Sequence, residues 1–349
     1  MSSSDSLAAD VDEHADTILQ VCSYRREDFD RVAVYFPPEE TQPVQSSLQS
    51  AFEMLPTAGV GVLERVPAEL ISIVLRELSI HSFLRFRQVN RQARIISTGL
   101  LEYRLVSRHC LQALRALLHT QLAPFFTISD VYRTLTTDEC STCGGFGGHM
   151  FLLTAERCCF DCLVGSNNYR VFSPFTFAKL ANIPLSRLGP RSGQRLRAVP
   201  GVYDTVMVSE DRPSYLVSEK KATKTLLATV TPEETIRQLR SYVRQPEQRF
   251  MVATAYPYYD LGNAILERGV SCKGCRLRKE RRRNLLPRDS RDKVFSTQGF
   301  LSHFSQCRKA QRLWPKSEKG ERRVREPRVS RGAGYCSRLD ETGLPRCHI

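Results

Sequence analysis

The spacing of apolar residues is the strongest structural signal in this chain, and it is helical across residues 63–118. The first predicted helix follows Pro67, a residue suited to the first turn of a helix. The apolar face of that helix comprises Leu70, Ile71, Val74, Leu75 and Leu78. Two more short helices are expected over residues 81–88 and 89–96, and a longer amphipathic helix over 100–118. The pattern thus predicts three short helices and a fourth that couples them to the rest of the chain.

Beyond residue 120 the pattern becomes a mixture of short alternating stretches and helical stretches. Strands are expected over residues 201–208, 214–217 and 249–254. A helix opened by a capping-box pattern is expected over residues 231–244, and another begins near Ser129. Residues 120–314 are therefore predicted to form a mixed α/β module, which makes the fold class α+β.

Both ends of the chain lack this periodicity. Residues 1–61 are rich in Ser, Pro and acids, and we expect them to be a mostly disordered acidic tail. Residues 315–349 are basic and interrupted by Gly and Pro, and we expect a flexible basic tail. The predicted organisation is therefore two flexible ends around a helical region, 62–119, and the module, 120–314.

Composition excludes some broad classes of protein. The 349 residues are 41% apolar, which is enough to bury a core, so the chain is not expected to be wholly disordered. No apolar run approaches the roughly 18 residues of a membrane-spanning helix. The first twenty residues hold five acids and no Lys or Arg, unlike a secretory signal. We expect a protein of the cytoplasm and/or nucleus with no membrane partner.

The net charge of +14 is unevenly distributed. Residues 1–62 contain eleven acids and three Arg, a net charge of −8, so residues 63–349 carry +22. A basic region of this size suits nucleic acid, a nuclear import receptor or an acidic protein, and charge alone does not choose among them.

The twelve cysteines change the picture, because paired thiols in a reducing compartment more often bind metal than form disulfides. The first group has two C-x2-C pairs, the spacing of a four-thiolate zinc site. Its expected ligands are Cys140, Cys143, Cys159 and Cys162. Cys158 is an alternative to Cys159 with a longer spacer, and His149 is a weaker substitute ligand. Gly144 allows a tight turn after the first pair, and Arg157 is a candidate for offsetting thiolate charge.

The second group combines a C-x2-C pair with a His and a Cys four residues apart, which share one face of a helix. Its expected ligands are Cys272, Cys275, His303 and Cys307. With four protein ligands each, both groups are expected to hold structural zinc, two ions in total, with no open position for catalysis. The chain also lacks a G-x-S-x-G turn and a phosphate-binding glycine loop, so we expect a non-catalytic protein.

The helical region also carries an ordered motif. Its elements are Leu63, Val66-Pro67, Glu69 before paired aliphatics, and the closing Val89-x-Arg91. This order resembles the F-box, although Val66 stands where Leu is commoner. The resemblance implies a trihelical unit that docks onto the Skp-type adaptor of a cullin ubiquitin ligase, while the rest of the chain captures a protein substrate. Together with the two cysteine groups, it extends to a group of fungal F-box proteins over residues 63–165 and 249–314.

Docking would use the apolar residues of the helical region. The expected adaptor-binding residues are Leu63, Pro67, Leu70, Ile71, Val74, Leu75, Leu78, Leu84 and Val89. Periodicity alone favours a plainer interpretation, in which these residues form only the core of a helical domain. The ordered motif reverses that preference.

A basic cluster follows the second C-x2-C pair and supports a rival hypothesis. It comprises Arg278, Lys279, Arg281, Arg282 and Arg283. These residues suit a nuclear import signal, contacts with phosphates, or a solvated loop. A fungal DNA-reading zinc cluster would need cysteine at position 282, where Arg282 stands. The alternative to a ligase subunit is therefore a zinc-stabilised nucleic-acid-binding or nuclear regulatory protein, and nucleic acid is the less favoured partner.

Overall fold

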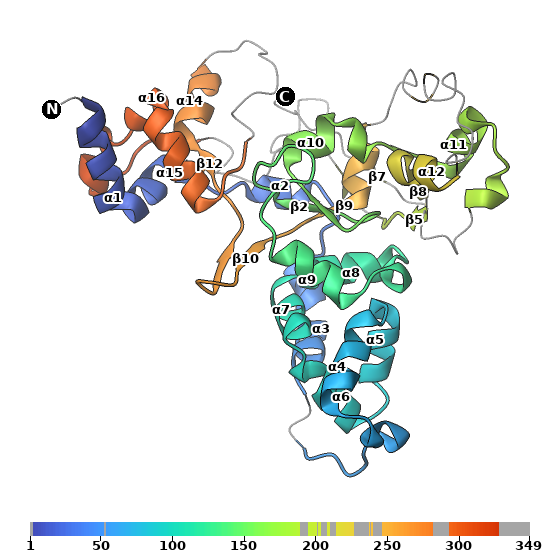
Figure 1. Ribbon diagram of the computed structural model, residues 1–349. Helices are drawn as coiled ribbons and strands as arrows, with labels where there is room; N and C mark the ends of the chain where they lie inside the picture. Colours follow the sequence, from blue (N-terminus) through green and yellow to red (C-terminus); the bar gives the residue numbers. More distant parts are fainter. Residues whose placement is uncertain are drawn as a thin grey trace.

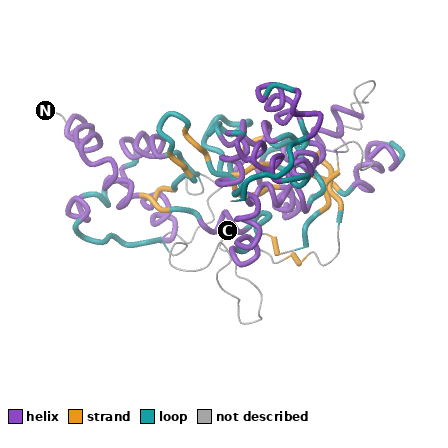
Figure 2. Tube along the Cα trace, turned by 90° about the horizontal axis from the view of Figure 1, so that it is seen from below, coloured by secondary structure: helices purple, strands orange, loops and turns teal. Residues whose placement is uncertain are grey.

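The structure of the protein is a computed structural model. It describes residues 3–51, 54–188, 195–200, 202–203, 208–209, 214–226, 237, 239, 246–281 and 293–327. Over these residues the chain is a mixed α and β protein in which helices predominate and the strands are short (Figure 2). None of the helices in these ranges has both the length and the apolar character needed to cross a membrane.

The two ends of the described chain fold together into one unit, here called the terminal unit. Its elements are α1 (Ser3–Cys22), β1 (Ser23–Tyr24), β12 (Ser271–Cys272), α14 (Lys273–Arg281), α15 (Thr297–Gln306), α16 (Arg308–Gln311) and η7 (Pro315–Gly320). β1 pairs antiparallel with β12, and α1 lies against α15 and η7 (Figure 1). The unit has its own core, in which Ile18 packs with Phe300, Phe304 and Trp314.

The expected disorder of residues 1–61 is therefore wrong for much of that segment. After β1 come α2 (Glu27–Arg31) and α3 (Pro38–Gln49), and the ring of Phe29 stacks on Phe160 at 3.7 Å between centroids. The Tyr103 hydroxyl donates to the carbonyl of Leu48 at 2.6 Å. Composition predicted disorder because this segment has few apolar residues. Many of those residues are nevertheless buried against parts of the chain more than fifty positions away in sequence.

The expected flexible tail over residues 315–349 is wrong for residues 315–320, which form η7. Ser317 is fully buried in the terminal unit, and the Lys273 Nζ lies 2.6 Å from the Glu326 Oε1. Residues 328–349 lie outside the described part of the chain.

The stretch with helical periodicity forms a series of short helices. They are η1 (Gly61–Arg65), α4 (Ala68–Glu77), α5 (Ile80–Arg87), α6 (Arg91–Gly99), α7 (Leu101–His109), α8 (Leu111–His119), η2 (Ala123–Phe125) and α9 (Ile128–Leu135). Side chains cap three of them: Ser79 for α5, Asn90 for α6, and Thr127, in a capping box with Asp130, for α9. In Figure 1, α4, α5 and α6 project from the body as an arm.

Two expectations in this stretch are corrected. The single helix expected over 100–118 is divided between α7 and α8, because Cys110 takes φ −118° and ψ 28°. Cys110 is buried, and the break lets α7 pack on α9 while α8 packs on a central strand. The cap of α9 is Thr127 rather than Ser129.

The centre of the molecule is a small antiparallel sheet in the order β3–β2–β9. Its strands are β2 (His149–Phe151), β3 (Glu156–Cys158) and β9 (Ala253–Ala255). The neighbouring elements are α10 (Phe160–Gly165), η3 (Asn167–Tyr169) and η6 (Pro246–Val252). The strand expected over 249–254 is therefore mostly η6, and only its end extends into β9. The amide of Val34 donates to the carbonyl of Ala253 at 2.9 Å, which places the 32–36 segment beside this sheet.

A second sheet, in the order β4–β8–β5, carries its own small core beside the centre. The elements here are β4 (Val171–Phe172), α11 (Pro174–Ala181), η4 (Leu185–Leu188), β5 (Arg195–Arg197), β8 (Tyr215–Ser218) and α12 (Glu219–Leu226). Short hairpins are formed by β6 (Val202–Tyr203) with β7 (Val208–Ser209), and by β10 (Tyr258–Asp260) with β11 (Ile265–Glu267). The helix expected over 231–244 lies largely outside the described residues.

Burial divides the chain differently from the predicted domains. One core runs from Phe29 through Ile71 and Leu75 of α4 to Met150 and Tyr256, so the helical region and the central sheet are continuous. The terminal unit, by contrast, is separate from that core. The expected module over 120–314 is thus split between the central body and the terminal unit.

Candidate metal centres and the exposed helical face

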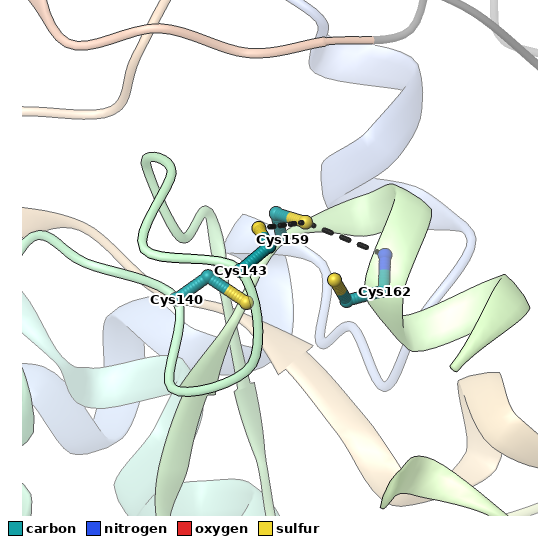
Figure 3. A group of neighbouring side chains, drawn as sticks. All are labelled: Cys140, Cys143, Cys159 and Cys162. Atoms are coloured by element: carbon teal, nitrogen blue, oxygen red, sulfur yellow. Dashed lines mark hydrogen bonds between the residues drawn. The ribbon is translucent and has the colours of Figure 1, made fainter. Parts of the chain in front are cut away.

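Four cysteines from two turns meet at the edge of the central body. They are Cys140, Cys143, Cys159 and Cys162, and their sulfurs all lie within 4.8 Å of one another (Figure 3). Cys140 and Cys143 sit in the turn after α9, where the Gly144 amide donates to the Cys140 carbonyl and Gly144 has φ +70°. That left-handed conformation explains the glycine. The group can hold a metal ion, as its spacing predicted.

The second turn of this centre is the beginning of α10. Cys159 is the N-cap residue, and its sulfur accepts the Cys162 amide at 3.3 Å. The Cys143 and Cys159 sulfurs are 3.7 Å apart. Each turn therefore presents two sulfurs on a rigid loop, and backbone N–H groups help to stabilise negative charge on them.

Hydrogen bonding and burial shift the protonation of these sulfurs in opposite directions. The hydrogen bond from Cys159 lowers the pKa of Cys140 to about 4, whereas burial raises the pKa of Cys162 to about 12. Four thiols this close cannot ionise together without a compensating cation. A bound metal would displace the remaining protons, which is the expected chemistry of such a group.

The nearby alternatives are not part of this centre. Cys158 is fully buried in β3, and burial raises the pKa of its thiol well above the usual value. The His149 Nε2 lies 3.1 Å from the Phe29 carbonyl, outside the sulfur group. Arg157, expected to offset thiolate charge, instead donates to the carbonyls of Thr134, Gly147 and Pro257. Its guanidinium ties the surrounding loops together.

The second predicted group also assembles, in the terminal unit. Cys272, Cys275, His303 and Cys307 place their ligand atoms within 4.8 Å of one another. The Cys275 sulfur lies 3.6 Å from both the His303 Nε2 and the Cys307 sulfur. His303 comes from α15 and Cys307 from the junction with α16, so this site joins three helices to β12.

The close contacts in the second group also shift the protonation of its members. Contact of the His303 ring with the Cys275 sulfur raises the pKa of His303 to about 9. Contact with the Cys272 and Cys275 thiols holds the pKa of Cys307 far below its usual value. Cys22, at the end of α1, is buried nearby, and burial raises the pKa of its thiol to about 12. Cys22 is not one of the four grouped residues.

Gly274, between two of the ligands, has no room for a side chain. A Cβ atom there would lie 2.4 Å from the backbone nitrogen of Ala310 and 2.5 Å from the carbonyl carbon of Lys309. Since both atoms belong to the backbone of α16, the helices would have to separate. The glycine therefore permits the close approach that brings Cys275 and Cys307 together.

We expect Gly274→Ala to destabilise the terminal unit by about 1–3 kcal/mol or more, the usual cost of overpacking a core. It should also reduce metal binding at this site. Thermal unfolding and metal content per chain measure the two effects. Gly165→Ala is the matched control, because nothing lies within 4 Å of a Cβ at that exposed position. Equal behaviour of the two variants would contradict the packing argument.

The predicted adaptor-binding residues divide into two groups. Ile71 and Leu75 are 8% and 2% exposed and belong to the central core, so these two predictions are better explained as packing. Leu78 and Leu84 are partly buried against the same core. The residues that remain exposed are Leu63, Pro67, Leu70, Val74 and Val89. Two exposed neighbours that the motif did not select, Val62 and Ile73, extend this apolar face.

The basic cluster lies where one described part of the chain ends, at residue 281. Arg278, Lys279 and Arg281 lie in α14, and their side-chain surroundings are outside the description. Arg282 and Arg283 lie outside the described residues altogether. The expected contacts with an import receptor or phosphates remain predictions.

No protein-family model, no curated protein and no solved structure matches this chain. The features of this chain that point to a function are the two groups that could hold metal, the exposed apolar face and the motif that accompanies it.

Proposed function

We propose that the chain is the non-catalytic substrate receptor of a Skp-cullin-F-box ubiquitin ligase. In this proposal α4–α6 and the preceding η1 bind a Skp-type adaptor, and through it cullin. The metal-braced remainder holds a protein substrate. The ubiquitin comes from a separate conjugating enzyme, so no residue of this chain takes part in acyl transfer.

The observation that carries the proposal is the apolar face left open on α4. Leu70, Ile73 and Val74 are 50%, 53% and 57% exposed, although Ile71 and Leu75 on the same helix are buried. The helix therefore has apolar residues on both sides, and its own chain covers only one side. Contiguous exposed apolar surface is typical of a protein interface. The F-box-like order from Leu63 to Arg91 gives that interface a specific partner.

We further propose that both centres hold zinc with a structural role. Zinc prefers thiolate and imidazole ligands in tetrahedral sets, and a Zn–S bond of about 2.3 Å implies sulfurs about 3.8 Å apart. The contacts of 3.7 Å between Cys143 and Cys159 and 3.6 Å between Cys275 and Cys307 match that spacing. Four protein ligands leave no position for a reacting water, so the ions would brace the fold.

The test of adaptor docking is a pair of double variants. Leu70→Ala with Val74→Ala should weaken binding of purified Skp-type adaptor at least a hundredfold, because central apolar anchors dominate such interfaces. Since both side chains are half exposed, the thermal stability of the chain should change little. Isothermal titration calorimetry with the full chain measures the affinity, and thermal unfolding checks the fold.

The matched control is Leu185→Ala with Leu261→Ala, two leucines of similar exposure outside the helical region. This variant should bind adaptor as the unaltered chain does. Undiminished binding by the α4 variant would refute the proposed docking face. Absence of adaptor binding by the unaltered chain, together with steeply salt-dependent binding of nucleic acid, would instead support the rival function.

A further inference from the structure

A cavity of about 350 Å³ opens where three separate segments of the chain meet, away from both metal centres and from the α4 face. Its walls come from the α2 region, the corner between α7 and α8, and the segment around β9 and β11. Residues that line it include Arg25, Asp30, Arg31, Arg108 and Arg268. A cavity of this volume is at the small end of the range for ligand sites, roughly 300–1,000 Å³.

The charge of the cavity is positive and largely uncompensated. Four arginines line it against two acids, Glu27 and Asp30, which leaves a net charge of 4 − 2 = +2. Arg25 pairs with Asp30. Among the residues that the structure describes, Arg31, Arg108 and Arg268 have no ion-pair partner, and all three are exposed. Three arginines without an ion-pair partner, from three segments, thus line one space together with a single unpaired acid.

The beginning of a helix also borders the cavity. α8 begins at Leu111, its first two residues line the cavity, and no side chain caps this end of the helix. The ends of α7 and α8 meet here with opposite partial charges of about half an electron each, so their dipoles largely cancel. The arginines therefore decide the sign of the potential, and the first amides of α8 have no side-chain cap.

The neighbouring histidine reports the same positive environment. Burial lowers the pKa of His109, and Arg108 and Arg268 lower it further because their charges oppose a second positive group. His109 stacks on Tyr259 with 5.1 Å between ring centroids. The His109 ring is therefore neutral at physiological pH. It lines the cavity without adding charge to it.

We propose that this cavity binds a phosphoryl group. A dianion matches the net charge of +2, whereas a single carboxylate would leave half of it uncompensated. A phosphoryl group presents three strong acceptor oxygens, and guanidinium groups bind such oxygens in charge-assisted pairs. Its source is either a phosphorylated side chain of a peptide or a small phosphate compound. The site is independent of adaptor docking, which can fail without affecting it.

The test uses the full metal-loaded chain in a calorimetric titration at fixed physiological salt. The probes are inorganic phosphate, acetate, and one short peptide prepared with phosphoserine and with serine. We expect phosphate and the phosphopeptide to bind at millimolar concentration or below, and acetate and the serine peptide not to bind. A clear preference for the phosphopeptide over phosphate identifies a phosphorylated protein as the source, and equal affinities identify a small phosphate compound.

The variants separate this cavity from the general positive charge of the chain. Arg108→Gln and Arg268→Gln should each weaken binding about tenfold or more, the usual effect of removing one charge-assisted contact. Arg187→Gln is the control, an exposed arginine on η4 outside the cavity that undergoes the same change of charge. Absence of binding by phosphate and phosphopeptide alike would overturn the proposal. So would equal weakening in the Arg187 variant, which would indicate diffuse electrostatic attraction.

Discussion

Replacement of Cys275 by serine is expected to release one of two metal ions per chain and to unfold both ends of the protein together. Cys275 contributes a sulfur that contacts His303 and Cys307 directly. A structural metal of this type contributes on the order of 10 kcal/mol to folding, more than a small core supplies alone. Because α1 packs on α15, residues near the N-terminus should lose protection although the substitution lies some 250 positions away.

Hydrogen exchange and metal analysis measure this effect. Amides of α1 and α15 should exchange fast in Cys275→Ser, while those of α8 and β2 stay protected in the separate central core. Cys22→Ala is the matched control, since Cys22 is a fully buried cysteine of the same core but lies outside the ligand group. It should keep two ions. Protected α1 amides in a Cys275 variant that has lost its metal would contradict the coupling.

Replacement of Cys159 by serine should have an effect of similar size on the central body. Cys159 both caps α10 and contacts the Cys143 sulfur, so its loss removes a ligand and a helix cap at once. Because the central core continues into α4 and α7–α9, those helices should be destabilised as well. We expect loss of one ion per chain and a much lower unfolding temperature.

The adjacent cysteine provides the control for this second substitution. Cys158→Ala removes a fully buried thiol next in sequence but outside the ligand group. It should retain both ions and cost only about 1–2 kcal/mol, typical of a small cavity in a core. If Cys158→Ala lost the ion and Cys159→Ser kept it, the ligand assignment would be reversed. Metal content and thermal unfolding distinguish the two outcomes.

The two groups of candidate metal ligands were predictable because their chemistry is local. A C-x2-C pair fixes two sulfurs on one turn, and His303 and Cys307 are four residues apart at the end of one helix, so spacing alone restricts each half of a site. The choice of Cys159 over Cys158 followed from the same rule and agrees with the structure. The fold decides how the two halves of each site come together. Because a C-x2-C pair supplies only two of the four ligands that zinc takes, the sequence still indicated which two halves form one site.

The divided helix around Cys110 shows the opposite case. No glycine or proline marks the break between α7 and α8, and the apolar periodicity continues across it. The break satisfies packing of α7 on α9 and of α8 on β9, elements distant in sequence. Helix propensity did not predict this break, because tertiary contacts override propensity. The cavity arginines were also missed, since each stands alone in the sequence and only folding brings them together.

The sequence by itself determined the helical region, the mixed fold class and the eight residues of the two groups that could hold metal, because each depends on the spacing of neighbouring residues. Only the tertiary structure decided that residues 11–24 complete the terminal unit. It also decided that Ile71 and Leu75 are core while Leu70 and Val74 stay exposed, and where the arginine cavity lies. The physical reason is that burial is a property of the whole chain. An apolar or charged residue carries no local sign of which distant surface will cover it.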